Sequence, residues 1–187
     1  MPYFLNPKRR NRKTWRAHLK YYLTLPIVRF LLWLGFPNRD YSYHDGYPGR
    51  LKIGEGCSTM NTYFNTNSGT ITLGDDTIFG DDCLIITGQH RFYKGKRARL
   101  VPGAPKEVPD EGNDIVIGSG CFICSGSIII KKVTIGDHVL LGAGSVVTKD
   151  IPSNCFACGV PAQVKHFFNT EDEKLELVNS LNAEQRI

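Results

Sequence analysis

Large hydrophobic residues recur at every sixth position through the middle of the chain. They stand in two runs: Leu73, Phe79 and Ile85, then Ile117, Ile123, Ile129, Ile135, Leu141 and Val147. A small or β-branched residue follows four positions after most of them: Thr77, Cys83, Cys121, Ser127, Val133, Val139, Ser145 and Ile151. Neither the 3.6-residue period of a helix nor the alternation of an ordinary strand fits this pattern. A short fixed repeat instead predicts a solenoid.

The six-residue spacing predicts short flat strands joined by corners. Each hexad supplies one strand and one corner, and three hexads close a coil of triangular cross-section. The large residue fills the interior, while Gly and Asp occupy the turns. Successive coils stack with a strand spacing of about 4.8 Å. We therefore expect an all-β solenoid in which Leu73, Ile117 and Ile135 begin three coils, with an irregular earlier coil at residues 53–72.

The N-terminal residues differ in charge from the rest of the chain. Residues 1–39 hold nine Lys or Arg and no Asp or Glu, although the whole chain has a net charge of only +5. Apolar residues at helical spacing predict amphipathic helices here. The stretch 21–36 is too short to span a bilayer and contains Pro26 and Arg29. Two hypotheses remain open: the helices pack on the body or a neighbouring subunit, or they contact the inner face of the membrane peripherally.

The C-terminal residues predict another helix. Thr170 and Glu173 fit a capping box, and Leu175, Val178 and Leu181 follow on one helical stripe. The chain is thus predicted to have three parts: a basic, amphipathic helical segment at residues 1–50, the solenoid at 51–167 with a loop at 87–114, and a C-terminal helix at 168–187.

Two Cys-x-x-Cys pairs, at 121–124 and 155–158, have a pattern that is common in zinc sites. The repeat argues against a metal, because Cys57, Cys83 and Cys121 fall on the small inward position of a hexad. Buried free cysteine behaves as a small hydrophobic residue. Six unpaired thiols also favour a cytoplasmic location, since the cytosol is reducing.

The repeat and two local sequences resemble the hexapeptide-repeat acyltransferase superfamily. The best-matching runs are Val133 to Pro152 and Gly159-Val-Pro-Ala162. The chain is most similar to the maltose/galactoside O-acetyltransferase-like branch, which includes enzymes that modify surface polysaccharides. The resemblance implies a left-handed parallel β-helix over residues 51–167. It also implies acetyl-CoA as co-substrate, a carbohydrate acceptor, and a homotrimer with active sites between subunits.

The repeat loses its phase between Ile85 and Ile117, where a loop rich in Gly and Pro leaves the scaffold. Long loops on rigid scaffolds are commonly functional. His90 stands where the strand ends and this loop begins. An imidazole can take the proton from an attacking hydroxyl, so acyl transfer from a thioester requires no nucleophilic Ser or Cys. In the resembled family the catalytic histidine lies in a Thr-x-x-His segment, which Thr87 to His90 match, so we predict that His90 is the general base.

The resemblance also suggests binding residues. Carried over by position, the coenzyme contacts are Ser125, Ala143, Thr148, Lys149 and Lys165. For Ser125 and Thr148, ordinary corner chemistry is the alternative. On the acceptor side the nearest match to the family's asparagine is Asn61, with Asn65 as competitor. Phe122 stands where a tryptophan is usual.

The predicted reaction is acetylation of a sugar hydroxyl, and we expect the sugar to belong to a surface polysaccharide. Five basic residues in the loop suggest an anionic acceptor such as a sialic acid polymer: Arg91, Lys94, Lys96, Arg97 and Arg99. A solvated face, or contacts with the coenzyme phosphates, are the alternatives. N-acetylation of an amino sugar, antibiotic acetylation and a non-catalytic β-helix scaffold remain competing functions. A zinc hydratase needs three histidine ligands, and only His90 and His138 lie in the solenoid. No nucleic-acid partner is predicted.

Overall fold

A computed structural model describes residues 42–47, 49–170, 173, 174, 176, 177 and 179. All structural statements below concern these residues. The predicted N-terminal helices fall at residues 1–41 and therefore lie outside them. Within this part of the chain, no helix is long and apolar enough to cross a membrane.

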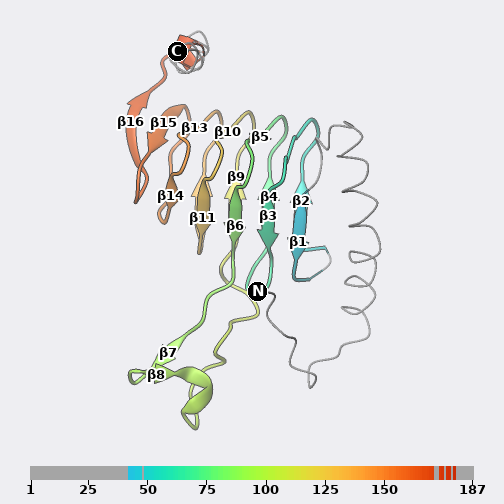
Figure 1. Cartoon of the computed structure of the whole chain (residues 1–187), viewed down its shortest axis with the longest axis vertical. Helices are drawn as coiled ribbons and strands as arrows, with labels where there is room; N and C mark the ends of the chain where they lie inside the picture. Colours follow the sequence, from blue (N-terminus) through green and yellow to red (C-terminus); the bar gives the residue numbers. More distant parts are fainter. Residues whose placement is uncertain (1–41, 48, 171–172, 175, 178, 180–187) are drawn as a thin grey trace, which may run out of the picture. The chain divides into compact units, whose positions relative to one another are not determined.

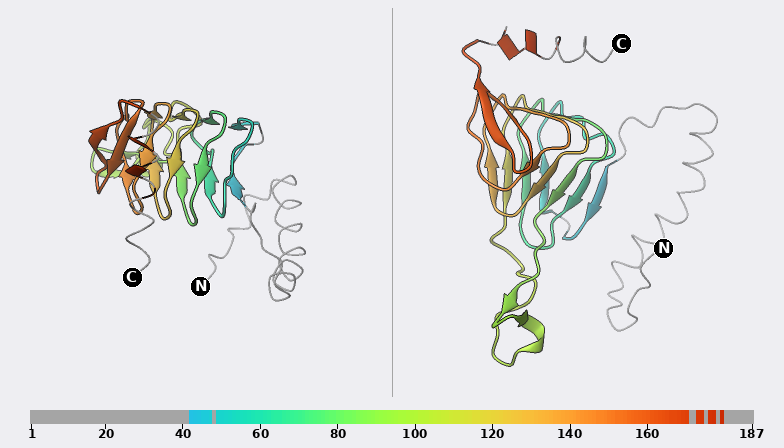
Figure 2. Two further views of the ribbon diagram at one scale, coloured as in Figure 1. Left: turned by 90° about the horizontal axis from the view of Figure 1, so that it is seen from above. Right: turned by 60° about the vertical axis from the view of Figure 1, so that its left-hand side comes forward.

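Through the middle of the solenoid, from β4 to β14, the strands outside the loop hairpin enter three different sheets in turn (Figure 1). Sheet A contains β1 (Tyr43–Asp45), β3 (Tyr63–Asn65), β6 (Leu84–Ile86), β11 (Ile128–Ile130) and β14 (Val146–Val147). Sheet B contains β2 (Leu51–Ile53), β4 (Ile71–Leu73), β9 (Ile115–Ile117) and β12 (Val133–Ile135). Sheet C contains β5 (Ile78–Phe79), β10 (Phe122–Ile123), β13 (Leu140–Leu141), β15 (Cys155–Cys158) and β16 (Gln163–Phe167). From β4 to β14, each turn of the chain adds one strand to each sheet, whereas the first and last turns are incomplete. Figure 2 shows the turns stacked one behind the next.

Strands of successive turns pair in parallel and in phase with the repeat. In sheet B, Leu73 pairs with Ile117, and Ile117 pairs with Ile135. The turn after the long loop therefore stacks directly on the turn before it. Only the end of sheet C departs from this arrangement, because β16 runs antiparallel to β15.

The interior is filled by the residues that the six-residue pattern places there. From Leu73 onward every predicted inward position, large or small, is at most 4 % exposed, whereas Cys57 in the irregular earlier coil is only partly buried. Burying one such aliphatic side chain contributes about 1.5–3 kcal/mol. Phe64 and Phe79 meet edge to face, with their ring centroids 5.9 Å apart. The prediction of the core is confirmed.

Aspartate and serine side chains hold one row of corners together. The backbone N–H of Asp75 donates to Ser119 Oγ at 3.1 Å, that of Ser119 to Asp137 Oδ1 at 2.8 Å, and that of Asp137 to Ser153 Oγ at 2.9 Å. Charged and neutral acceptors alternate, so no two carboxylates are neighbours in this row. Corner residues such as His138 (φ 56°) adopt the left-handed conformation.

The structure shows a strand before the predicted start of the solenoid and helical residues after its predicted end. Sheet A already begins at β1, upstream of residue 51, and β1 pairs with β3. At the other end the described residues between 173 and 179 are helical. Glu173 accepts a hydrogen bond from the N–H of Asn169 at 2.6 Å, while its own N–H donates to Thr170 Oγ1 at 3.3 Å. Lys174 Nζ donates to the carbonyl of Gly120 at 2.6 Å and so ties this segment to a corner.

Candidate active site

His90 lies three residues beyond a firmly anchored threonine at the end of β6. Thr87 is fully buried. Its hydroxyl donates to the carbonyl of Asn65 at 2.8 Å and accepts from the N–H of Ser68 at 3.1 Å. A Cβ on Gly88 would come within 2.9 Å of Asn65 Oδ1, so the chain leaves the sheet in close contact with β3. The coil therefore fixes the backbone from which His90 projects.

The loop that begins here stands apart from the stacked turns (Figure 1). It contains an antiparallel hairpin of β7 (Phe92–Tyr93) and β8 (Lys96–Arg97), followed by a short 3-10 helix, η2 (Ala98–Leu100). The returning segment reaches β9 by way of Glu107, whose carbonyl accepts from the N–H of Arg91 at 2.7 Å.

The Glu107 carboxylate contacts three side chains of the loop. Its Oε1 lies 3.2 Å from His90 Nδ1 and 2.5 Å from Arg97 Nε, and its Oε2 lies 3.5 Å from Arg99 Nε. The Glu107 side chain is only 11 % exposed, whereas that of His90 is 62 % exposed. A shielded carboxylate thus holds an accessible imidazole in place.

The carboxylate of Glu107 stays ionised in this environment. Its partial burial raises the pKa, but hydrogen bonds from Arg97 and His90, together with the charges of Arg97 and Arg99, outweigh that effect and lower the pKa overall. An ionised acceptor favours the histidine tautomer whose Nδ1–H donates to it. In that tautomer the Nε2 lone pair is available to take a proton.

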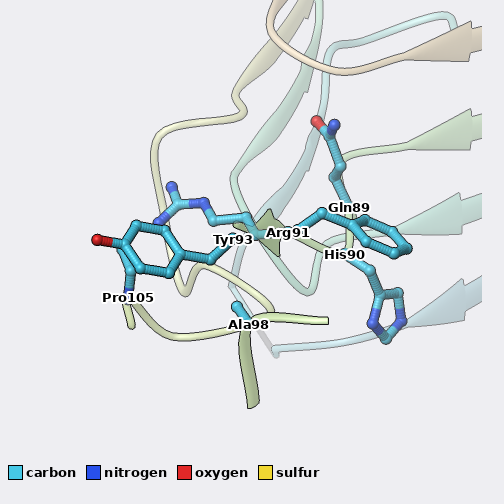
Figure 3. Close-up of a pocket in the computed structure, with 7 residues that line it drawn as sticks. Gln89, His90, Arg91, Tyr93, Ala98 and Pro105 are labelled. Carbon is cyan, nitrogen blue, oxygen red and sulfur yellow. The ribbon is translucent and has the colours of Figure 1, made fainter. Parts of the chain in front are cut away.

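A cavity of about 370 Å³ borders His90 on the loop. Its lining residues are Gln89, His90, Arg91, Phe92, Tyr93, Ala98 and Pro105. Figure 3 shows the Arg91 guanidinium beside the Tyr93 ring, with the His90 imidazole pointing the opposite way. The cavity therefore combines a basic, an aromatic and a titratable group.

The structure separates the two acceptor-side asparagines. Asn61 is an exposed corner residue with φ 45°, and its amide donates to Asp82 Oδ1. Asn65, by contrast, holds Thr87 through its carbonyl, and its side-chain oxygen lies next to Gly88. Asn65, the competitor, is thus the asparagine at the base of the His90 loop.

Two of the coenzyme candidates stack on one another at the corner between sheets C and A. Ser125 and Ala143 are exposed residues at equivalent positions in successive turns, and the N–H of Gly144 donates to the Ser125 carbonyl at 2.9 Å. The Ser125 hydroxyl also accepts from the N–H of Asp81 at 3.1 Å, which gives it a corner role of its own. A Cβ on Gly144 would meet nothing within 4 Å, so this corner presents open backbone.

The other coenzyme candidates lie elsewhere on the last turns. Thr148 is half-buried and Lys149 exposed, directly after β14 at the end of sheet A where the His90 loop leaves β6. Lys165 is exposed at a register shift of β16, between His166, which faces Phe156, and Val164.

Phe122 lies on the outer side of β10 in sheet C, in register with Ile78 and Leu140. His90 leaves from the end of a sheet A strand, so one chain places these two candidates on different sheets. Among the described residues, no hydrogen bond or ion pair joins His90 to Phe122 or to a coenzyme candidate.

The cysteines are spread through the solenoid as free thiols. All six are free, and within the described part of the chain no three His, Cys, Asp or Glu side chains gather as they would around a metal. Burial, and to a lesser degree the neighbouring Cys83, raises the pKa of the Cys124 thiol to about 11. The thiol is therefore protonated near neutral pH and weakly nucleophilic.

The sequence is similar to a known transferase family and to named acetyltransferases. A family model described as bacterial transferase hexapeptide (six repeats) matches residues 114–149. The galactoside O-acetyltransferase of Escherichia coli K12 is 36 % identical over 104 residues, which cover 56 % of this chain and 47 % of that protein. The galactoside O-acetyltransferase of Lactococcus lactis is 31 % identical over 144 residues, covering 66 % of each chain.

The fold is also similar to that of a solved acetyltransferase structure. A galactoside acetyltransferase in complex with coenzyme A superposes with a TM-score of 0.55 at 30 % identity, covering 71 % of this chain and 62 % of that one. The chain spans about half to two thirds of the length of the curated relatives it matches.

Proposed function

We propose that this chain, a member of the hexapeptide-repeat acyltransferase family, transfers an acetyl group from acetyl-CoA to a hydroxyl of a sugar acceptor. The observation that carries the proposal is the contact between His90 and Glu107 where the loop leaves the solenoid. The winding of the solenoid is then left-handed, as the family resemblance implies. The free thiols fit a cytoplasmic enzyme. For the basic N-terminal segment both hypotheses stay open: contact with the inner face of the membrane, or packing on the body or on a neighbouring subunit.

His90 acts as the general base in this mechanism. Its Nε2 takes the proton from the acceptor hydroxyl as the oxygen attacks the thioester carbonyl. The tetrahedral intermediate collapses to the acetyl ester and expels the coenzyme thiolate, which recovers the proton from the imidazolium. Glu107 keeps Nδ1–H hydrogen-bonded throughout and stabilises the imidazolium.

The mechanism is tested by following free thiol release from acetyl-CoA in the presence of neutral and acidic glycans. We expect release only with an acceptor, and a product whose acetyl group is labile to mild base, as an ester is. An amide product would instead support N-acetylation of an amino sugar, and antibiotic acetylation would be indicated by turnover of an antibiotic alone. The absence of any acceptor-dependent release would leave the scaffold function.

Replacing Glu107 with glutamine is expected to lower kcat by about ten- to hundredfold, comparable to the loss of a carboxylate that orients a metal-binding histidine. A neutral amide no longer fixes the Nδ1–H tautomer or stabilises the imidazolium. Because Glu107 acts through His90, the KM for acetyl-CoA should change little, and Glu107→Asp should restore part of kcat. Glu111→Gln, an exposed change in the same loop, is the matched control. Equal losses in kcat and in coenzyme affinity would point to a collapsed loop instead.

Direct transfer also predicts a mild effect at Cys124. Cys124→Ser should keep activity within about threefold, because a thiol with a pKa of about 11 is not the acyl carrier. Mass spectrometry of the wild-type protein after incubation with acetyl-CoA should find no acetylated cysteine. A trapped adduct on Cys124 that is consumed when acceptor is added would contradict direct transfer.

Binding of acetyl-CoA is assigned to the exposed corner and end of the last turns. The open backbone at Gly144, flanked by Ser125 and Ala143, suits the amide-rich pantetheine arm. Lysine side chains suit the phosphates, and Lys149 and Lys165 are both exposed.

Two apolar outer faces support a homotrimer. Partly exposed aliphatic side chains cover sheet A: Leu84, Ile86, Ile128, Ile130 and Val146. A second apolar row crosses sheet C and includes Ile78 and Phe122, whereas sheet B carries polar groups such as Lys52 and Thr134. A cyclic trimer needs two different contact surfaces on each copy. Packing sheet A of one copy near sheet C of the next would also bring His90 and Phe122 of different copies toward one site.

A further inference from the structure

The hairpin of the loop has two chemically different faces. Side chains alternate along an extended strand, so His90 and Phe92 share one side, and Arg91 and Tyr93 share the other. Phe92 pairs with Arg97 across the hairpin, and Tyr93 pairs with Lys96. The first side contains the contacts of His90 and Arg97 to Glu107.

The second side contains cations without acidic partners. Arg97 and Arg99 are occupied by Glu107, whereas no ion pair involves Arg91 or Lys96 within the described residues. Lys94 Nζ lies 5.5 Å from the centroid of the Tyr93 ring. We call this side, made of Arg91, Tyr93, Lys94 and Lys96, the cationic face. Two of its members, Arg91 and Tyr93, line the cavity that also borders His90, and Lys96 is the cross-strand partner of Tyr93.

We propose that the cationic face binds the carboxylates of an acidic oligosaccharide acceptor, one or more sugars away from the residue that His90 deprotonates. This inference rests on the proposed function. Arginine recognises carboxylates through its planar fork of N–H groups, and a tyrosine ring offers an apolar surface to a sugar. Arg91 and His90 point to opposite sides of the strand, so one ligand that contacts both must extend around it (Figure 3). A chain of sugars meets this requirement better than a single sugar.

The test compares Arg91→Gln/Lys96→Gln with Lys52→Gln/Lys132→Gln, which removes the same charge from exposed positions outside the loop. The acceptors are tetramers of galacturonic acid and of sialic acid, each with its carboxyl-reduced counterpart. For the loop variant we expect kcat/KM with the better acidic tetramer to fall about tenfold, through KM, because exposed ion pairs are individually weak. The loss should be confined to the acidic acceptor and should shrink at high salt. The control variant should match the wild type.

Other outcomes overturn the inference. Equal losses on acidic and carboxyl-reduced tetramers would assign the residues to the loop's structure, and a raised KM for acetyl-CoA alone would assign them to the coenzyme phosphates. A wild type that prefers the reduced tetramers would also reject it while leaving the proposed function intact. If no glycan is acetylated, the proposed function fails. In that case the inference can still be tested by binding alone, by titrating the fluorescence of Tyr93→Trp with the same tetramers. The inference requires that an acidic tetramer binds more tightly than its carboxyl-reduced counterpart, and equal binding would reject it.

Discussion

Replacing His90 with alanine is expected to lower kcat for acetyl transfer by about 10²- to 10⁴-fold, the usual contribution of a positioned general base. The acceptor hydroxyl would then have to lose its proton to water as it attacks. The KM values for acetyl-CoA and for the acceptor should change much less, since the His90 side chain is 62 % exposed and its hydrogen bond is to Glu107. Free imidazole added to the variant should restore part of the rate, because the removed side chain leaves space beside the cavity.

The control for this variant is another exposed histidine near a carboxylate. His166 Nε2 lies 3.9 Å from Glu173 Oε2, and its side chain is 54 % exposed. His166→Ala should keep kcat near the wild-type value, and both variants should unfold at the wild-type temperature. A His90→Ala protein with full acetyl-CoA-dependent activity would show that another group accepts the proton.

The fold could be predicted because the repeat encodes it locally. In a stacked solenoid each inward position is set by its place in the hexad, so Ile117 and Ile135 could be assigned to the core without knowing their partners. The irregular first turns were harder. Strand β1 pairs with β3, which lies 20 residues further along the chain, and no hexad marks β1.

The candidate site was predictable only in part, because its central contact is not periodic. The loss of phase after Ile85 identified the loop and His90. Glu107 lies 17 residues further along in a segment without a pattern, and the fold of the hairpin alone brings it back to His90. Its one signal in the sequence is a carboxylate close to a run of basic residues.

The basic run itself shows why composition does not assign roles. All five residues look alike in sequence, yet Arg97 and Arg99 neutralise Glu107 inside the loop while Arg91 borders the cavity. Likewise, spacing favoured Asn61, but the pairing of β3 with β6 brings Asn65 to the stem of the loop. In both cases the position of a side chain depends on contacts between segments that are distant in sequence.

Introducing glutamate at Ile128 tests whether the active site is completed between copies. Ile128 stands in the middle of the apolar outer face of sheet A, between Leu84 and Val146. An unpaired charge buried in an interface costs about 3–5 kcal/mol, so the affinity between copies should fall at least about 100-fold. Light scattering should show monomers, and specific activity should rise with protein concentration, which it does not do for a stable trimer. Val116→Glu changes a side chain that is 40 % exposed on the outer side of sheet B, and it should keep the oligomeric state and activity of the wild type. A monomeric Ile128→Glu protein with full activity at every concentration would mean that one chain holds the whole site, and that His90 and its coenzyme residues approach each other within it.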